Sequence, residues 1–134
     1  MQDGHRPVVV VVDDDEAVRE SLRFLLDVAG YDVATFESAQ DYLDHVTGQP
    51  PTCLVPATCL VVDQHMPRTS GLELLAMLRQ RGSRLPAVLI TGSVSPDIVR
   101  RATALGVMRV LEKPLADDAL LCFVARAASG ICVH

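Results

Sequence analysis

The stretch VVVVVDDDE, residues 8–16, runs five valines directly into three aspartates and a glutamate. A continuous run of β-branched residues is typical of a strand that is buried on both faces, as in a parallel sheet. The aspartates that follow would repel one another at the end of this strand, and partial burial would increase the cost. We therefore expect something to offset the repulsion, either the N-terminus of a helix or a bound cation.

The composition is that of one small globular domain. Of 134 residues, 49% are hydrophobic and 22% are charged, which is enough to enclose a single core. The net charge of −5 argues against direct contact with nucleic acid, because phosphate binding needs a basic patch. The sequence contains neither an apolar run of about 20 residues nor the pattern of a signal peptide, so we expect a cytoplasmic domain without membrane contact. The four cysteines lack C-x-x-C spacing, which favours reduced thiols, two or three of them buried.

Strand and helix patterns alternate along the chain. The β-rich runs are 7–12, 32–36, 59–63, 87–91 and 108–112. A helical pattern follows each run, with Ser38 as an N-cap, Pro96 in a first turn and Gly30 after a C-terminus. This alternation predicts an α/β fold, in which five helices flank a single doubly wound, five-stranded parallel sheet. The proline-rich segment 47–58 is expected to be a long connection, either a tolerated insertion or part of a partner surface.

Charged and hydroxyl side chains follow four of the five expected strands. Ligands of open α/β sheets bind beyond the carboxyl ends of the strands. The side chains at these ends are Asp13, Asp14, Asp15, Asp63, Thr91 and Lys113. Each has an ordinary explanation by itself: Asp13 and Glu16 have the spacing of a capping box, and the others suit turns or solvated positions. One shared site explains all of them together.

The chemistry of this residue set suits phosphoryl transfer. Several carboxylates around a small space suit Mg²⁺, which takes one or two carboxylates together with phosphate oxygens. A lysine beside the cation adds positive charge around a phosphoryl group. An aspartate can act as the nucleophile and form an aspartyl phosphate. Asp63 is the best candidate, because it stands at a central strand end apart from the acidic run, and Thr91 can then donate a hydrogen bond to the phosphate.

A family resemblance is carried by four segments: VVVVVDDDEAVRESLRFLL, LVVDQHMPRTSGLELL, AVLITG and VLEKP. In this order they resemble the receiver domain of response regulators in two-component signalling, and most of all the receivers of nitrogen-fixation and LuxR-type transcriptional regulators. The resemblance implies a flavodoxin-like receiver fold with the sheet order 2-1-3-4-5. We assign this domain to residues 7–128, with short tails at 1–6 and 129–134.

The resemblance also implies a role for each site residue. Asp63 would accept a phosphoryl group from a sensor histidine kinase, and Lys113 and Thr91 would contact its oxygens. The Mg²⁺ ligands would be Asp13, Asp14, Asp63 and the backbone carbonyl of His65. The peptide bond between Lys113 and Pro114 is often cis in this family, and Asp15 is expected to cap the first helix instead of binding metal. The domain would be a signalling domain that catalyses only its own phosphorylation and dephosphorylation, and not an enzyme.

Two positions invite separate expectations. The family usually has a Tyr or Phe where this chain has Val110, so the usual threonine–aromatic relay is in doubt. Either the output surface is read differently or the receiver switches weakly. His65 lies two residues after Asp63, and we expect it to tune the lifetime of the aspartyl phosphate together with Ser93; the alternative is a solvated loop histidine.

Other functions stay open at this point. A haloacid-dehalogenase-type phosphatase would use Asp13 as its nucleophile and Asp15 as its acid, but it leaves Asp63 unexplained. A degenerate receiver would act as a phosphorylation-independent protein-binding module, a reading that only Val110 supports. The chain is either a stand-alone receiver or a piece of a longer regulator with an effector domain. The resemblance also implies that phosphorylation would favour a homodimer.

Overall fold

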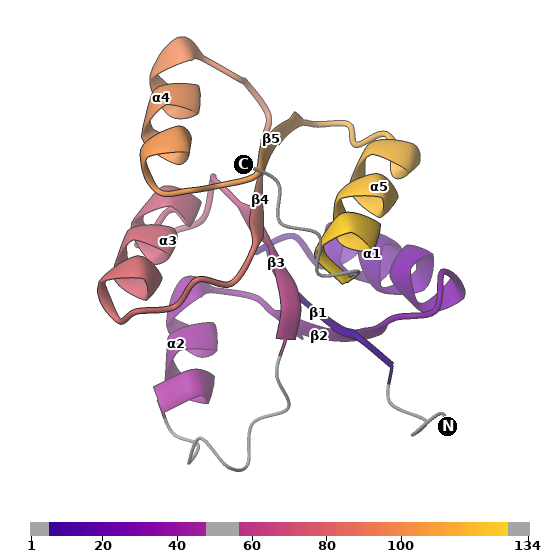
Figure 1. The fold of residues 1–134 in the computed structure, drawn as a ribbon. Helices are drawn as coiled ribbons and strands as arrows, with labels where there is room; N and C mark the ends of the chain where they lie inside the picture. Colours follow the sequence, from indigo (N-terminus) through magenta and orange to yellow (C-terminus); the bar gives the residue numbers. More distant parts are fainter. Residues whose placement is uncertain (1–5, 48–56, 129–134) are drawn as a thin grey trace.

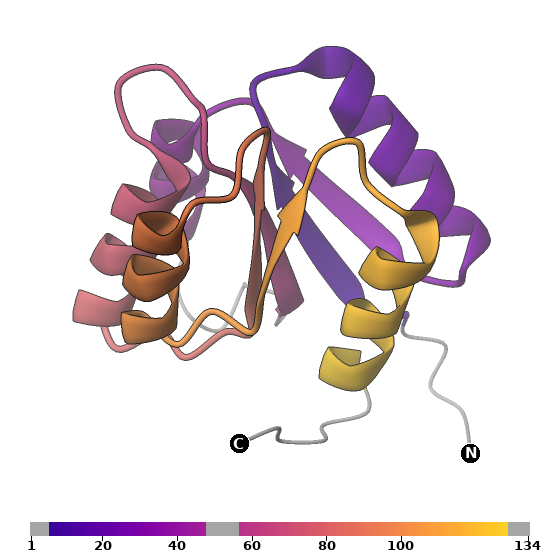
Figure 2. The same cartoon turned by 90° about the horizontal axis from the view of Figure 1, so that it is seen from above.

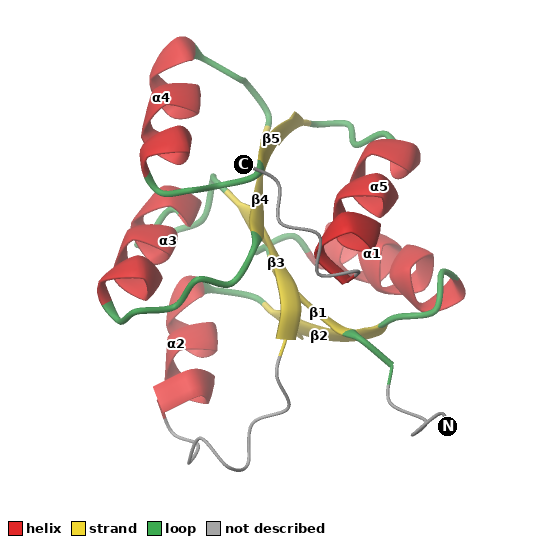
Figure 3. Cartoon of the chain, in the orientation of Figure 1, coloured by secondary structure: helices red, strands yellow, loops and turns green. Residues whose placement is uncertain are grey.

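Five strands alternate with five helices in the computed structural model, which describes residues 6–47 and 57–128 (Figure 3). The strands are β1 (Val8–Val12), β2 (Asp32–Phe36), β3 (Ala57–Asp63), β4 (Ala87–Thr91) and β5 (Arg109–Glu112). The helices are α1 (Glu16–Val28), α2 (Ala39–Thr47), α3 (Gly71–Gln80), α4 (Pro96–Ala104) and α5 (Asp117–Ala128).

All neighbouring strands pair in parallel, in the order β2-β1-β3-β4-β5. The predicted sheet order is therefore confirmed. Helices α2, α3 and α4 cover one face of the sheet, and α1 and α5 cover the other (Figures 1 and 2). This arrangement brings the carboxyl ends of all five strands to one edge of the sheet, where ligands of open α/β folds bind.

The valines of β1 divide the core into two layers. Val10 and Val12 pack with the residues of α2, α3 and α4, whereas Val9 and Val11 pack with those of α1 and α5. Successive side chains of a strand point to opposite faces, so a strand with helices on both sides needs an apolar residue at every position. These four valines are at most 5% exposed. The unbroken valine run is thus a direct consequence of the position of β1 inside the sheet.

The predicted connection at 47–58 was too long at both ends. Thr47 is the last residue of α2, and Ala57 and Thr58 are the first residues of β3. The strand extends this far because Val8 pairs with Ala57 and Val9 with Cys59, with a register shift between the two pairs. A shift of this kind leaves Thr58 as an extra residue, and it breaks the pattern by which strands are recognised.

Several smaller expectations can be compared with the described residues. Ser38 caps α2, since its Oγ accepts a hydrogen bond from the backbone N–H of Asp41 at 3.0 Å. Cys59 is buried, which raises the pKa of its thiol to about 12, whereas Cys122 is exposed. The other two cysteines and most of the expected connection and tails lie outside the described residues. None of the described helices is both long and apolar enough to cross a membrane.

Candidate functional site

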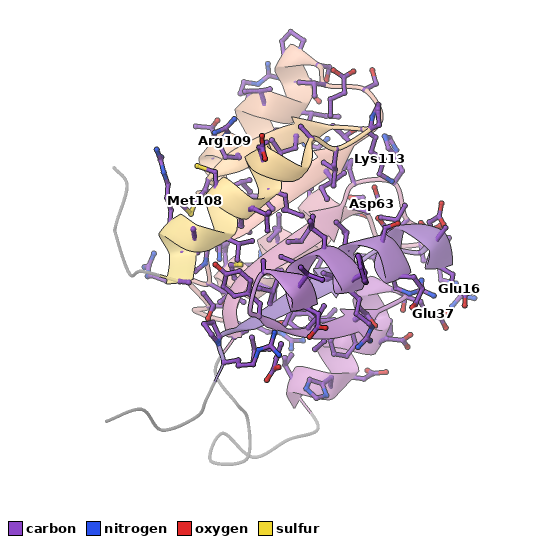
Figure 4. The ribbon with its side chains drawn as sticks, turned by 90° about the vertical axis from the view of Figure 1, so that its right-hand side faces the viewer. Glu16, Glu37, Asp63, Met108, Arg109 and Lys113 are labelled. Carbon is purple, nitrogen blue, oxygen red and sulfur yellow. The ribbon has the colours of Figure 1, made fainter. Side chains whose placement is uncertain are left out.

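The expected site residues meet at one end of the sheet. Asp13 and Asp14 follow β1, Asp63 ends β3, and one carboxylate oxygen from each of these three residues lies within 4.8 Å of the others. The Nζ atom of Lys113, just after β5, lies 3.2 Å from Oδ1 of Asp63 and 3.7 Å from Oδ2 of Asp13. Figure 4 shows Lys113 and Asp63 at this end of the sheet, with Met108 and Arg109 toward the other.

The acidic cluster contains two buried oxygen atoms that accept no hydrogen bond. They are Oδ2 of Asp13 and Oδ1 of Asp63. These two residues are 1% and 2% exposed, respectively. Their ion pairs with Lys113 supply one positive charge to three carboxylates. Buried carboxylate oxygens are normally satisfied by hydrogen bonds or by a metal ion. The oxygen-only donor set, with two buried oxygens that accept no hydrogen bond, fits a hard divalent cation such as Mg²⁺.

The electrostatics of the site disfavours the ionised form of its buried carboxylates in the absence of a cation. Burial raises the pKa of Asp63, and the charge of Asp14 raises it further, although Lys113 acts in the opposite direction. Burial also raises the pKa of Asp13, as does the charge of Asp63. Burial by itself would lower the pKa of Lys113, but the neighbouring carboxylates outweigh it, so that this pKa is raised. The metal-free site therefore holds an excess of negative charge.

We expect the variant Asp13→Asn to be more stable than the parent chain when no metal is present. The folded chain binds a proton on Asp13 more tightly than the unfolded chain, so the ionised form costs stability at neutral pH. Removing this charge should stabilise the fold by about 1–2 kcal/mol. The asparagine Oδ1 can still accept the hydrogen bond that Asp13 receives from the backbone N–H of Asp15.

This prediction has a pH dependence of known sign. As the pH falls through the raised pKa of the folded chain toward the ordinary value of 3.8, the parent becomes protonated and the advantage of the variant should disappear. Urea unfolding in EDTA, at neutral and at acidic pH, measures both effects. Glu20→Gln, at an exposed position of α1, is the control and should change little. Equal or lower stability of Asp13→Asn at neutral pH would contradict the prediction.

The start of α1 fixes the acidic residues in place. Asp15 is the N-cap of α1, and its Oδ1 accepts hydrogen bonds from the backbone N–H groups of Ala17 at 2.9 Å and Val18 at 3.4 Å. The expectation that Asp15 caps this helix is confirmed. The reading of Asp13 and Glu16 as a capping box is wrong, because Oδ1 of Asp13 accepts from the N–H of Asp15 at 2.9 Å. The side chain of Asp13 is thereby turned toward the site.

Sequence reasoning missed several residues that hold the site in shape. Arg19 donates a hydrogen bond from Nη1 to the backbone carbonyl of Asp13 at 2.7 Å. Gln64 accepts a hydrogen bond at its side-chain oxygen from the N–H of Leu72, at the start of α3. Backbone hydrogen bonds from Gln64 to Ile90 and from Lys113 to Thr91 continue the sheet past its strands. Among these features, only the start of α3 could have been predicted from the sequence. Ser70 and Glu73 have the spacing of a capping box, and they form one in the structure.

Thr91 lies at the site, but its hydroxyl group is engaged elsewhere. The residue is fully buried, and its Oγ1 accepts a hydrogen bond from the N–H of Ser93 at 3.2 Å. The same atom lies 3.1 Å from the carbonyl oxygen of Ser93 and 3.2 Å from Nε2 of His65. His65 is exposed, yet this contact distinguishes it from a merely solvated loop histidine. Val110 is half-buried and packs against the core layer of α2, α3 and α4.

The peptide bond between Lys113 and Pro114 is cis, as the resemblance implied. A hollow of about 800 Å³ opens beside it, between α1 and the segment that follows β5. Its lining includes Leu25, Leu115 and Phe24, and the last of these is 71% exposed. Lys113 therefore stands between the acidic cluster and an apolar surface.

Comparison with known proteins gives a consistent family. The sequence model of one protein family, the response regulator receiver domain, matches residues 9–125. The transcriptional regulatory protein FixJ of Azorhizobium caulinodans is 42% identical over 122 residues, which cover 91% of this chain and 54% of that protein. FixJ of Bradyrhizobium diazoefficiens is 38% identical over 124 residues, covering 92% and 56%. The crystal structure of full-length FixJ from B. japonicum is 37% identical with a TM-score of 0.79, and covers 92% of this chain and 58% of that one.

The relatives are longer proteins, and the chain spans about half the length of the curated relatives it matches. Their names confirm the predicted resemblance to transcriptional regulators. The family model covers the sequence from the valine run of β1 to α5, and the sheet order agrees with it. This chain belongs to the family of response regulator receiver domains.

Proposed function

We propose that residues 7–128 take a phosphoryl group from a sensor histidine kinase onto Asp63, in a reaction that depends on Mg²⁺. One observation carries the proposal: the buried Oδ1 of Asp63 accepts no hydrogen bond and faces Nζ of Lys113 at 3.2 Å. A carboxylate kept in this state is available as a nucleophile. The lysine is placed where the negative charge of a phosphoryl group would develop.

The residues of the chain would divide the chemistry between them. A carboxylate oxygen of Asp63 forms a bond to phosphorus while the bond from phosphorus to the donor breaks, and the donor leaves with its electron pair. Lys113 pairs with the phosphoryl oxygens, and Thr91 donates a hydrogen bond to one of them. The proposed Mg²⁺ ligands are Asp13, Asp14, Asp63 and the backbone carbonyl of His65. When bound, Mg²⁺ would neutralise the carboxylates and the incoming phosphoryl oxygens.

The surface beside the site suits a protein as the donor. The hollow between α1 and the segment after β5 is lined mainly by apolar side chains, together with Glu20, Ser21 and Lys113 itself. Phe24 and Val28, one turn apart on α1, are 71% and 70% exposed. Apolar surface of this kind is typical of a protein contact. We propose that the kinase docks here and delivers its phosphoryl group past Lys113.

The signal would then pass to a partner. Because the relatives are about twice as long as this chain, we propose an effector domain in a longer regulator as its recipient. A homodimer that forms on phosphorylation, a cytoplasmic location and the lack of direct nucleic-acid contact stay predictions. The alternative function is a phosphorylation-independent binding module, and Val110 is the feature that favours it.

Intact mass measurement with acetyl phosphate tests the proposal. In the presence of Mg²⁺ we expect one added phosphoryl group per chain, and with EDTA we expect none. Single, self-limiting uptake distinguishes this function from a phosphatase, which would turn over many ester molecules. A folded protein that binds Mg²⁺ but gains no mass would contradict the proposal and favour the binding module.

A further inference from the structure

We propose that His65 is a positioning residue that holds the hydroxyl group of Thr91 in the unphosphorylated chain, and that a phosphoryl group on Asp63 must displace it. The inference rests on the proposed function, because it concerns the exchange of partners by Thr91. In this proposal His65 restrains the hydroxyl group of Thr91. Val110 carries no ring and does not supply such a restraint.

The first step is the hydrogen-bonding capacity of Thr91. A hydroxyl group has one proton to donate and two lone pairs. In this structure the Oγ1 atom of Thr91 has three neighbours: the N–H and the carbonyl oxygen of Ser93, and Nε2 of His65. Whichever tautomer His65 adopts, these neighbours occupy the proton and at least one lone pair. Among the described residues no hydrogen bond joins Thr91 to Asp63, so the threonine must exchange a partner before it can donate to a phosphoryl oxygen.

The second step is to decide which partner is lost. Ser93 lies two residues from Thr91, so its contacts belong to a local turn that moves with the threonine. His65 lies 26 residues away, in the loop between β3 and α3. In the part of the chain that the structure describes, it is the one side chain from another element that hydrogen-bonds Thr91. We therefore expect a movement of this turn toward Asp63 to break the contact with His65, whichever tautomer the ring adopts.

The third step concerns which parts of the structure the exchange of partners by Thr91 would alter. The imidazole ring of His65 is at an exposed position, so it can leave Thr91 for solvent without opening the core. Val110 stays packed against the layer of α2, α3 and α4 and has no ring to follow the threonine. The exchange would thus alter the loops after β3 and β4, next to Asp63. No aromatic side chain on β5 would move with Thr91.

The matched variants are His65→Leu, which removes the hydrogen bond, and His65→Gln, whose amide can replace it. Both keep the backbone carbonyl of residue 65. In the metal-free chain we expect His65→Leu to move the NMR signals of the Thr91 methyl group and the Ser93 amide. His65→Gln should leave them near their parent positions, and so should His45→Gln, which changes a histidine on α2.

Binding of beryllofluoride with Mg²⁺ gives a second readout that hydrolysis does not disturb, since this phosphoryl analogue is not hydrolysed. Because His65→Leu loses one competing hydrogen bond, we expect it to bind beryllofluoride about two- to tenfold more tightly than the parent chain. In a Thr91→Ala background the same substitution should have no effect, because the coupling runs through the hydroxyl group.

The outcomes separate the inference from the proposed function. If the parent chain binds no beryllofluoride, the proposed function fails. If the parent binds it, but His65→Leu neither moves the Ser93 amide nor changes the affinity, the positioning role of His65 is overturned. An equal effect of His65→Leu with and without Thr91 would also overturn it.

Discussion

Asp63→Asn is expected to gain no phosphoryl group from acetyl phosphate and Mg²⁺, where the parent chain gains one. The asparagine side chain has nearly the same shape, so the fold should be kept, but its amide is not a nucleophile. The neighbouring carboxylates are not expected to replace it, because Oδ2 of Asp13 lies farther from Nζ of Lys113, at 3.7 Å against 3.2 Å for Asp63, and Asp14 is exposed to solvent. The expected change is therefore complete loss of the adduct.

The measurement is the intact mass of both proteins after the same incubation. Hydroxylamine should remove the adduct of the parent chain, since it cleaves an acyl phosphate and leaves a phosphate ester intact. Two further variants separate the nucleophile from its surroundings. Asp14→Asn keeps Asp63 and should be phosphorylated more slowly, and Glu37→Gln, at an exposed position, should behave as the parent does. A phosphoryl adduct on Asp63→Asn would show that another residue is the acceptor.

The sequence predicted the elements well, because burial of apolar residues dominates their energetics. The valines of β1 could be assigned to a strand inside a parallel sheet because a strand with helices on both sides needs an apolar residue at every position. The convergence of Asp13, Asp63 and Lys113 followed from the same topology, which brings the ends of parallel strands to one edge. The site could thus be located before any distance was known.

The partners of individual polar groups could not be predicted in this way. The contact between His65 and Thr91 depends on the conformations of two loops, and a hydrogen bond contributes only about 1 kcal/mol, which leaves no pattern in the sequence. The same is true of Arg19, whose side chain reaches back to the carbonyl group of Asp13. The early start of β3 at Ala57 was missed because the register shift interrupts its regular pairing.

Gly71→Ala is expected to destabilise the fold by about 2–3 kcal/mol, because an alanine side chain has no room at this position. A Cβ atom on Gly71 would lie 2.6 Å from the backbone oxygen of Asp63, 2.8 Å from Cδ1 of Leu89 and 2.9 Å from Cγ1 of Val62. Leu89 and Val62 belong to the buried centre of the sheet, so none of these neighbours can withdraw easily. The gain in helix propensity is small at the first position of α3.

The same substitution should also slow phosphoryl uptake, because the overlap falls on the backbone of the proposed phosphoacceptor itself. Relief of a 2.6 Å contact requires either α3 or the end of β3 to shift, and the second choice moves Asp63 relative to Lys113. Gly92→Ala is the matched control for stability, since a Cβ atom there would meet no atom within 4 Å. Urea unfolding and the rate of mass gain from acetyl phosphate measure the two effects. If Gly71→Ala were as stable as Gly92→Ala, the close packing of α3 against the end of β3 would not determine the geometry of the site.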